Sequence, residues 1–458
     1  MRYVSTRGDA PALDFREATL AGLARDGGLY VPAEWPRLTR GEIAALAGLD
    51  YPATAARLLA RFSGGVLDED ALQPIARAAY ARFAHAAVTP LVQLDARHWL
   101  LELFHGPTLA FKDVALQLLG LLFERFLGAD QAPLTVIGAT SGDTGSAAID
   151  ALAGRAGIEI FMLHPQGRVS DVQRRQMTTV LAPNVHNIAI DGSFDDAQAL
   201  VKAMFAAPAL ADLRLGAVNS INWARLAAQI VYYFHAAVRL GAPERPVAFS
   251  VPTGNFGDVF AGYVAACMGL PVARLIVATN VNDILHRALS QGDYSVGTVT
   301  PTAAPSMDIQ VSSNFERLLF DMNGRDGART AAQMAQFAAT RRLALPPAPP
   351  LFASARIDAD DMALAMRWAQ DAAGQLIDPH GAIGLAAARA ADLRRDVPVV
   401  TLATAHPAKF RDAVERATGV RPPLPARVGD LFARAERCAS LPATLDAVIA
   451  YVREHAAR

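Results

Sequence analysis

Lys112 lies where a lysine side chain could act as a nucleophile. It follows the Gly106-Pro107 turn, and the apolar residues from Val114 onward predict a helix. Burial and the positive end of a helix dipole both disfavour a protonated amine, so we expect a lowered pKa for Lys112. A neutral lysine can condense with a carbonyl group. The alternative is a lysine that extends from an amphipathic helix into solvent.

Lysine is rare in this chain. Of the 43 Lys and Arg residues, three are lysines: Lys112, Lys202 and Lys409. Arginine stays protonated and is a poor nucleophile, so each remaining lysine is a candidate for chemistry that arginine cannot supply. Lys202 falls in an amphipathic helical pattern and is interpreted as a solvated charge. Lys112 and Lys409 lie in more unusual local sequences.

Two glycine-bearing loops each follow a predicted strand and precede a predicted helix. The candidate residues of the first loop are Thr140, Ser141, Gly142, Asp143, Thr144 and Gly145. Those of the second are Gly254, Asn255, Phe256, Gly257 and Asp258. Backbone N–H groups and hydroxyls at such turns suit a carboxylate or a phosphate, although each loop alone could be a plain turn. The first loop has neither the Walker nor the dinucleotide spacing. Together the loops indicate a ligand with two anionic groups, or two anionic ligands in one cleft.

Two further segments could add polar groups to the same site. Asn219 and Ser220 precede a predicted helix that contains Arg225. A guanidinium binds phosphate through paired hydrogen bonds, but read alone the segment favours a helix cap with a surface arginine. Thr404 follows the final predicted strand, at the end where open α/β sheets bind ligands. A lone threonine there is more often a cap.

Short apolar runs alternate with helical patterns beyond residue 88, which predicts an α/β protein with largely parallel sheets. The predicted strands are Leu134–Ile137, Ile158–Leu163, Val185–Ile190, Val247–Val251, Arg274–Ala278 and Val399–Leu402. The first 88 residues are predicted to be mostly helical, with helices at 41–49, 53–62 and 68–86. The proline-rich run 346–350 predicts a surface connection.

Composition narrows the class of protein. A chain of 458 residues that is 52% apolar and 19% charged can form two or three packed units and is not a disordered scaffold. A net charge of −1 with no basic run gives no indication of a nucleic-acid or membrane-surface partner. We find no signal sequence and no bilayer-length apolar stretch. Two cysteines are too few for a disulfide framework, so we expect a cytoplasmic protein. We expect no metal site.

Taken in order, these motifs resemble those of the threonine synthase family in its bacterial and fungal form. They are Phe-Lys-Asp at 111–113, Gly-Ala-Thr-Ser-Gly-Asp-Thr-Gly at 138–145, Asn-Ser-Ile-Asn at 219–222, Gly-Asn-Phe-Gly-Asp at 254–258 and Thr-Ala-His-Pro-Ala-Lys-Phe at 404–410. The segments 3–8 and 26–32 also resemble the N-terminal part of that family. The resemblance covers essentially the whole chain and is least supported at 325–355.

The resemblance implies pyridoxal 5′-phosphate bound to Lys112 as a Schiff base. It implies that the cofactor phosphate and its surroundings are held by Gly254, Asn255, Phe256, Gly257 and Asp258, and that Thr404 faces the pyridine nitrogen. The loop Thr140–Gly145 would receive the substrate α-carboxylate. Asn219, Ser220 and Arg225 would receive the substrate phosphate.

The resemblance also implies an architecture. Two open twisted sheets with helices on both faces are expected, as in tryptophan synthase β and the other fold type II pyridoxal-phosphate enzymes, together with a helical N-terminal segment. The expected division is an N-terminal domain at 1–88, a larger cofactor-binding domain from 89–110 and 221–458, and a smaller domain at 111–220 that carries the substrate loop.

The implied reaction eliminates phosphate from O-phospho-L-homoserine and adds water at Cβ, which gives L-threonine and phosphate. Three alternatives stay open: a phospho-lyase that releases 2-ketobutyrate, a serine/threonine dehydratase, and a non-catalytic binding protein. A dehydratase would not need the phosphate group of Asn219, Ser220 and Arg225. Retention of Lys112 in a lysine-poor chain argues against the non-catalytic alternative. The expected partner is this small molecule alone, in a monomer or a homodimer.

Overall fold

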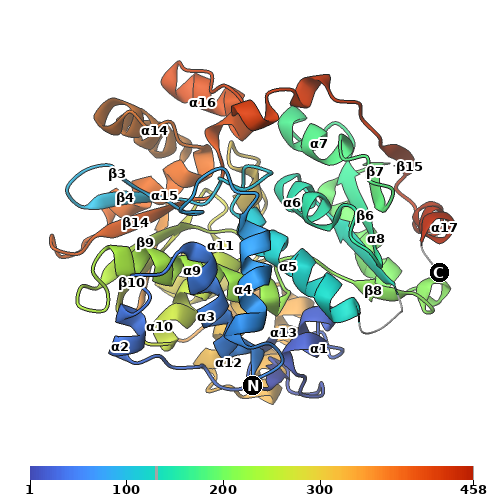
Figure 1. Cartoon of the computed structure of the whole chain (residues 1–458), viewed down its shortest axis with the longest axis horizontal. Helices are drawn as coiled ribbons and strands as arrows, with labels where there is room; N and C mark the ends of the chain where they lie inside the picture. The colour runs from blue at the N-terminus through green and yellow to red at the C-terminus, as the bar shows by residue number, and fades with distance from the viewer. Residues whose placement is uncertain (129–132, 457–458) are drawn as a thin grey trace.

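Two α/β units lie side by side in the computed structural model, which describes residues 1–128 and 133–456 (Figure 1). Each unit is built around an open sheet with helices on both faces. All six predicted strands are present within these sheets. The expected α/β class with two open sheets is therefore confirmed.

The larger sheet has six strands. Their order is β13 (Phe352–Arg356), β10 (Val272–Thr279), β9 (Val247–Pro252), β14 (Val399–Ala403), β4 (His98–Glu102) and β3 (Leu91–Gln93). In this sheet β3 runs antiparallel to β4 and the other pairs are parallel. Phe249 of β9 packs in one apolar core with α10 (Gly257–Cys267), whereas its neighbour Ala248 packs in a second core with α15 (Pro379–Ala390). Both faces are covered, which explains the nearly continuous apolar strands.

The smaller sheet is entirely parallel. Its order is β15 (Ala439–Pro442), β7 (Val185–Asp191), β6 (Ile158–Pro165), β5 (Leu134–Ala139) and β8 (Arg214–Gly216). Ile137 packs with α8 (Phe194–Phe205) and α17 (Leu445–His455) on one face. Val136 packs with α5 (Lys112–Leu127) and α6 (Asp143–Leu152) on the other.

The C-terminal residues differ from the expected domain division. Residues 221–458 were all expected in the larger unit, but β15 pairs with β7 and α17 packs on α8, at the right edge of Figure 1. The sheet that an edge strand joins is decided by long-range pairing. The four residues of β15 follow a polar connection, and nothing in their local sequence indicates that they pair with β7.

The N-terminal segment packs across both units. It contains the antiparallel pair β1 (Tyr3–Ser5) and β2 (Tyr30–Pro32), and the helices α1 (Phe15–Ala21), α2 (Arg40–Ala44), α3 (Tyr51–Ser63) and α4 (Glu69–Tyr80). Tyr3, Trp35 and Phe62 surround the buried Trp223 with ring centroids 5.7 to 6.0 Å apart. The predicted helix at 68–86 is too long, because the backbone N–H of Ala84 donates to the carbonyl of His105 instead of continuing the helix.

The remaining elements complete the two units. They are α7 (Asp171–Thr178), α9 (Trp223–Arg239), α11 (Ile284–Gln291), α12 (Phe315–Met322), α13 (Gly327–Thr340), α14 (Ala359–Ala373), α16 (Arg411–Thr418), the 3₁₀ turns η1 (Pro208–Leu210), η2 (Pro305–Met307), η3 (Pro407–Phe410), η4 (Ala426–Val428) and η5 (Leu431–Ala433), and the pair β11 (Asp293–Ser295) and β12 (Arg342–Ala344). Residues 346–350 form a largely exposed connection from β12 to β13, as predicted.

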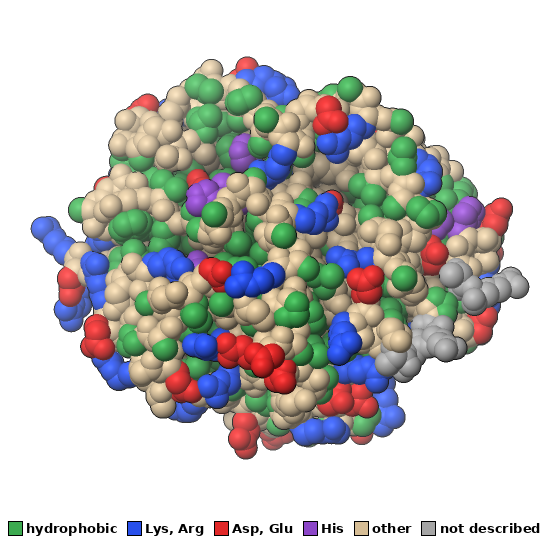
Figure 2. Space-filling view, viewed as in Figure 1, with side chains coloured by type: hydrophobic (Ala, Val, Ile, Leu, Met, Phe, Trp, Pro, Cys, Tyr) green, Lys and Arg blue, Asp and Glu red, His purple; other side chains and the backbone are tan. Residues whose placement is uncertain are grey.

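Acidic and basic side chains are interspersed on the face shown in Figure 2, and no large field of one sign covers it. Within 1–128 and 133–456, no helix combines the length and apolar character needed to cross a bilayer.

Candidate active site

Lys112 is the first residue of α5, and the turn before it is held by its neighbour Asp113. The Asp113 carboxylate accepts hydrogen bonds from the backbone N–H of Thr108 at 2.8 Å and from its hydroxyl at 2.7 Å. The Lys112 side chain is 11% exposed, and burial lowers its pKa. The expected helix-start position and lowered pKa are confirmed. A lysine extended into solvent does not fit this side chain.

Thr404 lies beside this lysine because β14 continues into a short antiparallel contact. Ala405 pairs with Ala110, and the backbone N–H of Phe111 donates to the Thr404 carbonyl at 2.8 Å. Thr404 is buried. The carboxyl end of a central strand is therefore held against the start of α5, as expected for a ligand site in an open α/β sheet.

The first glycine loop joins β5 to α6, and part of its hydrogen-bonding capacity is already used. The Thr140 hydroxyl accepts from the N–H groups of Gly142 at 2.9 Å and Gly145 at 2.8 Å. These two N–H groups are therefore not free for a ligand, contrary to the expectation for the loop as a whole. Ser141 and Thr144 are partly exposed, and α6 has no side-chain cap at its N-terminus. The capacity of this loop to bind an anion therefore lies mainly with the Ser141 and Thr144 side chains and the uncapped N-terminus of α6.

Asp143 connects the first loop to two of the three lysines. Its Oδ1 lies 2.7 Å from Lys409 Nζ and accepts from the Gln173 amide at 2.9 Å, while its Oδ2 lies 3.5 Å from Lys112 Nζ. Burial acts to raise the pKa of the Asp143 carboxyl, but the two lysines and the Gln173 amide bring it well below its usual range. Sequence reasoning missed Gln173 and the partner of Lys409. The scarcity of lysine was the signal that pointed to Lys409.

The second glycine loop joins β9 to α10, and its conformation leaves no room for a side chain at Gly254. A Cβ atom there would lie 2.6 Å from the carbonyl oxygen of Ser306. Phe256 adopts φ 62°, a left-handed conformation that costs a non-glycine residue on the order of 1 kcal/mol and is concentrated at functional sites. The N–H groups at the start of α10 have no side-chain cap.

Asp258, at the end of this motif, has one carboxylate oxygen without a hydrogen-bond partner among the described residues. Its Oδ1 accepts from the hydroxyls of Tyr232 and Tyr233, whereas its buried Oδ2 has no hydrogen-bond partner within the described residues. Burial raises the pKa of Asp258 to about 6, against the lowering effect of the two tyrosines and Lys112. Both tyrosines lie on α9, and nothing local in the sequence links them to Asp258.

The segment Ser312–Asn314 anchors the second loop and was also missed. The Ser312 hydroxyl donates to the carbonyl of Gly254 at 2.8 Å, and the Asn314 N–H donates to that of Asn255 at 3.0 Å. The Ser313 hydroxyl donates to Asn255 Oδ1 at 3.3 Å and lies 3.4 Å from the hydroxyl of Ser220. Ser313 therefore brings the 219–225 segment and the second loop together.

Arg225 is buried rather than exposed, with 3% of its surface accessible. Its Nη1 donates to the carbonyl of Val218 at 2.8 Å, and its Nε has no partner in the part of the chain that the structure describes. The helix cap is Asn222, whose Oδ1 accepts from the Ala224 N–H at 3.0 Å. The interpretation of the segment as a helix cap is confirmed at Asn222, whereas the surface position of the arginine is wrong. Asn219 itself is exposed.

The charges of these residues converge on Lys112. Asp143 raises the pKa of Lys112, whereas Lys409 and Arg225 lower it further. Burial lowers the pKa of Arg225 to about 10. A buried guanidinium without a carboxylate partner is costly unless an anion joins it. The site thus combines a deprotonatable amine with a cation suited to a second anion.

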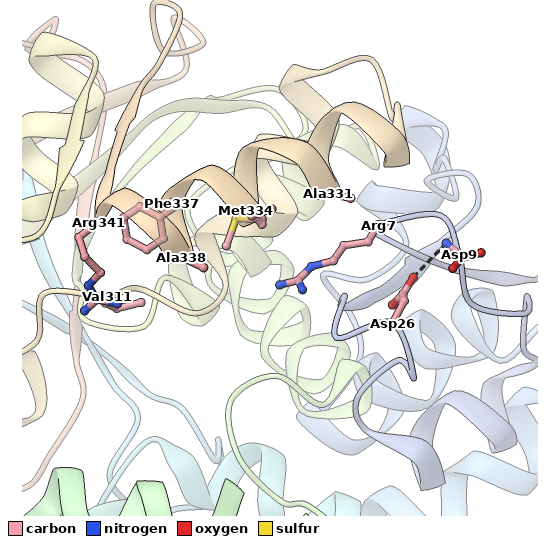
Figure 3. Close-up of a pocket in the computed structure, with 10 residues that line it drawn as sticks. Arg7, Asp9, Asp26, Val311, Ala331, Met334, Phe337, Ala338 and Arg341 are labelled. Atoms are coloured by element: carbon pink, nitrogen blue, oxygen red, sulfur yellow. Dashed lines mark hydrogen bonds between the residues drawn. The ribbon is translucent and has the colours of Figure 1, made fainter. Parts of the chain in front are cut away.

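A hollow of about 490 Å³ is lined by a different set of residues (Figure 3). It is lined by the N-terminal segment, Val311 and α13, and contains none of the candidate site residues. Arg7 at its edge is paired with Glu316 at 2.9 Å. Among the described residues, no group of three or more His, Cys, Asp or Glu side chains is arranged to hold a metal ion.

Family models match nearly the whole chain. Residues 83–346 match the model for "Pyridoxal-phosphate dependent enzyme", residues 2–80 match "Threonine synthase N terminus", and residues 381–452 match "Threonine synthase, C-terminal". The fold and the lysine-centred site, together with the first of these matches, define a pyridoxal-phosphate dependent enzyme.

Full-length relatives narrow the class. A threonine synthase from Pseudomonas aeruginosa is 54% identical, and the match covers 100% of this chain and 99% of the relative. A threonine synthase from Corynebacterium glutamicum is 42% identical, and the match covers 99% of this chain and 98% of the relative. The crystal structure of PLP-bound threonine synthase from Brucella melitensis matches with a TM-score of 0.97 and 51% identity, over 100% of both chains. The chain belongs to the threonine synthase family.

The residues present fit the cofactor of this family. Lys112 is a part-buried amine with a lowered pKa, which favours the neutral form that attacks an aldehyde. The loop at Gly254 is too tight for a side chain, and the α10 N-terminus behind it is uncapped, which suits the close approach of a phosphate to backbone N–H groups. The unpartnered Asp258 Oδ2 offers an additional polar atom at this loop.

Proposed function

We propose that this enzyme converts O-phospho-L-homoserine and water into L-threonine and inorganic phosphate, with the cofactor carried by Lys112. The observation that supports this substrate most directly is Arg225. It is a buried cation whose Nε has no hydrogen-bond partner in residues 1–128 and 133–456, and it is close enough to Lys112 to lower the pKa of that amine. A substrate with a second anionic group would supply the missing partner.

The cofactor is assigned to the residues around the second loop. Gly254, Asn255, Phe256, Gly257 and Asp258 would hold its phosphate and the neighbouring ring, and Thr404 would meet the pyridine nitrogen. A phosphate dianion nearby would raise the pKa of Asp258 further, so a protonated Oδ2 could donate to it.

The substrate is assigned to the other two segments. Ser141 and Thr144 would bind the α-carboxylate with the N-terminus of α6, while Thr140, Gly142 and Gly145 set the shape of the loop and Asp143 connects it to the lysines. Asn219, Ser220 and Arg225 would bind the substrate phosphate.

The chemistry follows from these positions. Bound pyridoxal phosphate supplies an electron sink for a carbanion at Cα. Lys112 is placed to accept the Cα proton, and as the amine nearest the reacting carbons it is the candidate for the transfer at Cβ. Arg225 holds the γ-phosphate while negative charge builds on it as the C–O bond breaks. A neutral hydroxyl at Thr404 would leave the pyridine nitrogen unprotonated, which is consistent with elimination chemistry.

Product analysis tests the proposal. Purified enzyme supplied with O-phospho-L-homoserine should release phosphate and threonine in equal amounts. Phosphate with 2-ketobutyrate instead of threonine would identify a phospho-lyase. Turnover of serine or threonine without phosphate release would identify a dehydratase. No turnover of any of these substrates would leave a binding protein.

Three further assignments are proposals of the same kind. We propose a monomer or homodimer, to be measured by light scattering, and a cytoplasmic location, to be measured by cell fractionation. We also propose that the chain divides at about residues 88, 110 and 220, with 439–455 added to the smaller unit. Limited proteolysis would test that division.

A further inference from the structure

Lys409 was singled out in the sequence because lysine is rare, but the proposed reaction assigns it no role. It lies in η3, just beyond the carboxyl end of β14, and its side chain is fully buried at 0% exposure. Its Nζ lies 2.7 Å from Asp143 Oδ1 and donates to the Thr108 carbonyl at 2.8 Å. One ammonium therefore joins the larger sheet, the turn before Lys112 and the substrate loop.

Lys409 and Lys112 share a single carboxylate. Lys409 and Gln173 both contact Asp143 Oδ1, whereas Lys112 contacts Oδ2 at the longer distance of 3.5 Å. One carboxylate balances one ammonium, and an unbalanced buried charge is costly. The more deeply buried lysine with the shorter contact has the stronger hold on Asp143. Lys112 can then lose its proton without leaving Asp143 unpaired.

We propose that Lys409 is a positioning residue that supplies the positive charge paired with Asp143, so that Lys112 rests as a neutral amine. The inference deepens the proposed function and rests on it, because it takes Lys112 as the amine that reacts. A carboxylate so close to Lys112 would otherwise hold that amine as its own ammonium partner. Lys409 removes this competition while Asp143 still fixes the position of the substrate loop.

The contacts also explain why this cation is a lysine in a chain rich in arginine. The two acceptors, Asp143 Oδ1 and the Thr108 carbonyl, lie within 2.8 Å of one nitrogen atom. An ammonium is a compact charge that suits such a site, whereas a guanidinium carries five donors in a plane and would leave several buried without partners.

Other charged groups also surround the two amines. The pKa of Lys112 is raised by Asp143 of α6 and lowered by Lys409 of η3 and Arg225 of α9. Lys112 in turn lowers the pKa of Asp258 in α10. Lys409 also acts on the carboxyl of Asp113 in α5. Arg225 lowers the pKa of Lys112 in the same direction as Lys409, so the Lys409 variants are compared in an enzyme that keeps Arg225.

The test measures the protonation of Lys112 in the full chain freed of cofactor. A brief pulse of a small acylating reagent at a series of pH values, followed by mass spectrometry, gives the midpoint pH of labelling for each lysine. Lys202 is exposed and serves as the internal reference. The rate of reloading with pyridoxal phosphate, followed by absorbance, gives a second pH profile that depends on neutral Lys112.

Lys409→Met and Asp143→Asn should shift the Lys112 midpoint in opposite directions, and for each variant the labelling and reloading profiles should shift together. Lys409→Met removes the cation and should raise the Lys112 midpoint by about one to three pH units, the range expected for a close charge. Asp143→Asn removes the anion and should lower it. The double variant should fall between the two, and Lys409→Arg should restore the parent midpoint at least partly. Lys202→Met is the matched control and should change neither profile.

A folded Lys409→Met protein with the parent Lys112 midpoint would overturn the inference. If that variant does not fold, Asp143→Asn decides the matter, because an unchanged or raised midpoint there is equally contrary. Failure of the proposed function is distinguishable. Reduction of the bound cofactor would then fix it on a lysine other than Lys112, or product analysis would show a different reaction, whatever the midpoint does.

Discussion

Arg225→Ala is the perturbation that most directly tests the phosphate site. Arg225 is 3% exposed, and its Nη1 donates to the carbonyl of Val218 while the buried Nε has no partner within the described residues. Losing that bond and the packing of the buried side chain lowers stability, whereas removing a buried guanidinium without a carboxylate partner within the described residues raises it, and the two opposing effects are each about 1–3 kcal/mol. The thermal midpoint should therefore change little. Any large effect on turnover then belongs to the reaction.

The expected effect on turnover is large. A charge-assisted contact to a leaving phosphate contributes about 2–4 kcal/mol of transition-state stabilisation, so Arg225→Ala should lower kcat/KM for O-phosphohomoserine by about 30- to 1000-fold. Arg225→Lys should restore part of this, because an ammonium keeps the charge and lacks the paired donors. The shift of the cofactor absorbance on adding serine, which has no phosphate, should be unaffected.

The assay is phosphate release at low substrate concentration, since that rate reports transition-state binding. Arg239→Ala is the matched control at the other end of α9, where the guanidinium donates to the carbonyls of His235 and Leu49. It should keep parent activity. Parent turnover of O-phosphohomoserine in Arg225→Ala would refute the phosphate assignment. So would an equal loss of the response to serine.

The remaining predictions concern the cofactor and its loops. Lys112→Arg should abolish turnover, and borohydride reduction of the parent should attach the cofactor to Lys112, as peptide mapping would show. Gly254→Ala should weaken cofactor retention in a titration, because its Cβ would meet the Ser306 carbonyl at 2.6 Å, whereas Ser141→Ala and Thr144→Ala should keep the cofactor and weaken amino-acid binding; equal cofactor loss in all three would contradict the division. The pKa of Asp258 is raised to about 6 in the folded protein. Between about pH 4 and 6 the folded protein therefore keeps a proton that the unfolded chain has released. The free energy of unfolding should decrease by up to about 3 kcal/mol as the pH rises through this range. Asp258→Asn should flatten that part of the cofactor-free melting profile, and an unchanged slope would contradict the shift.

The features that the sequence predicted are those with local causes. A Gly-Pro turn before an apolar run places Lys112 at a helix start, and a glycine loop between a strand and a helix can expose backbone N–H groups at the helix N-terminus. The first loop follows β5 of the smaller sheet and the second follows β9 of the larger sheet, so the rule that ligands bind at the carboxyl ends of parallel strands places each loop at the binding edge of its own sheet. This explains why the strands, both loops and the setting of Lys112 were predictable.

The features that were missed depend on contacts between distant residues or on competition within a loop. Thr108 and Lys409 are 301 residues apart in the sequence, and no local pattern links them. The same holds for Ser312 and Gly254, which are 58 residues apart. Within the first loop, the Thr140 hydroxyl accepts hydrogen bonds from two N–H groups that the glycine pattern alone predicts to be free for a ligand. Threonine side chains compete in this way for nearby backbone donors.

The pairing of β15 with β7 has a consequence for the order in which the protein can be completed on the ribosome. The other four strands of the smaller sheet lie within residues 134–216, whereas β15 begins at Ala439. At about 5–20 residues per second, β7 waits on the order of ten seconds or more for its neighbour. During that time its backbone N–H and carbonyl groups form an open, apolar strand edge, which is the feature that most readily pairs with other chains. The nascent chain should therefore depend on protection of this edge until translation has passed residue 442.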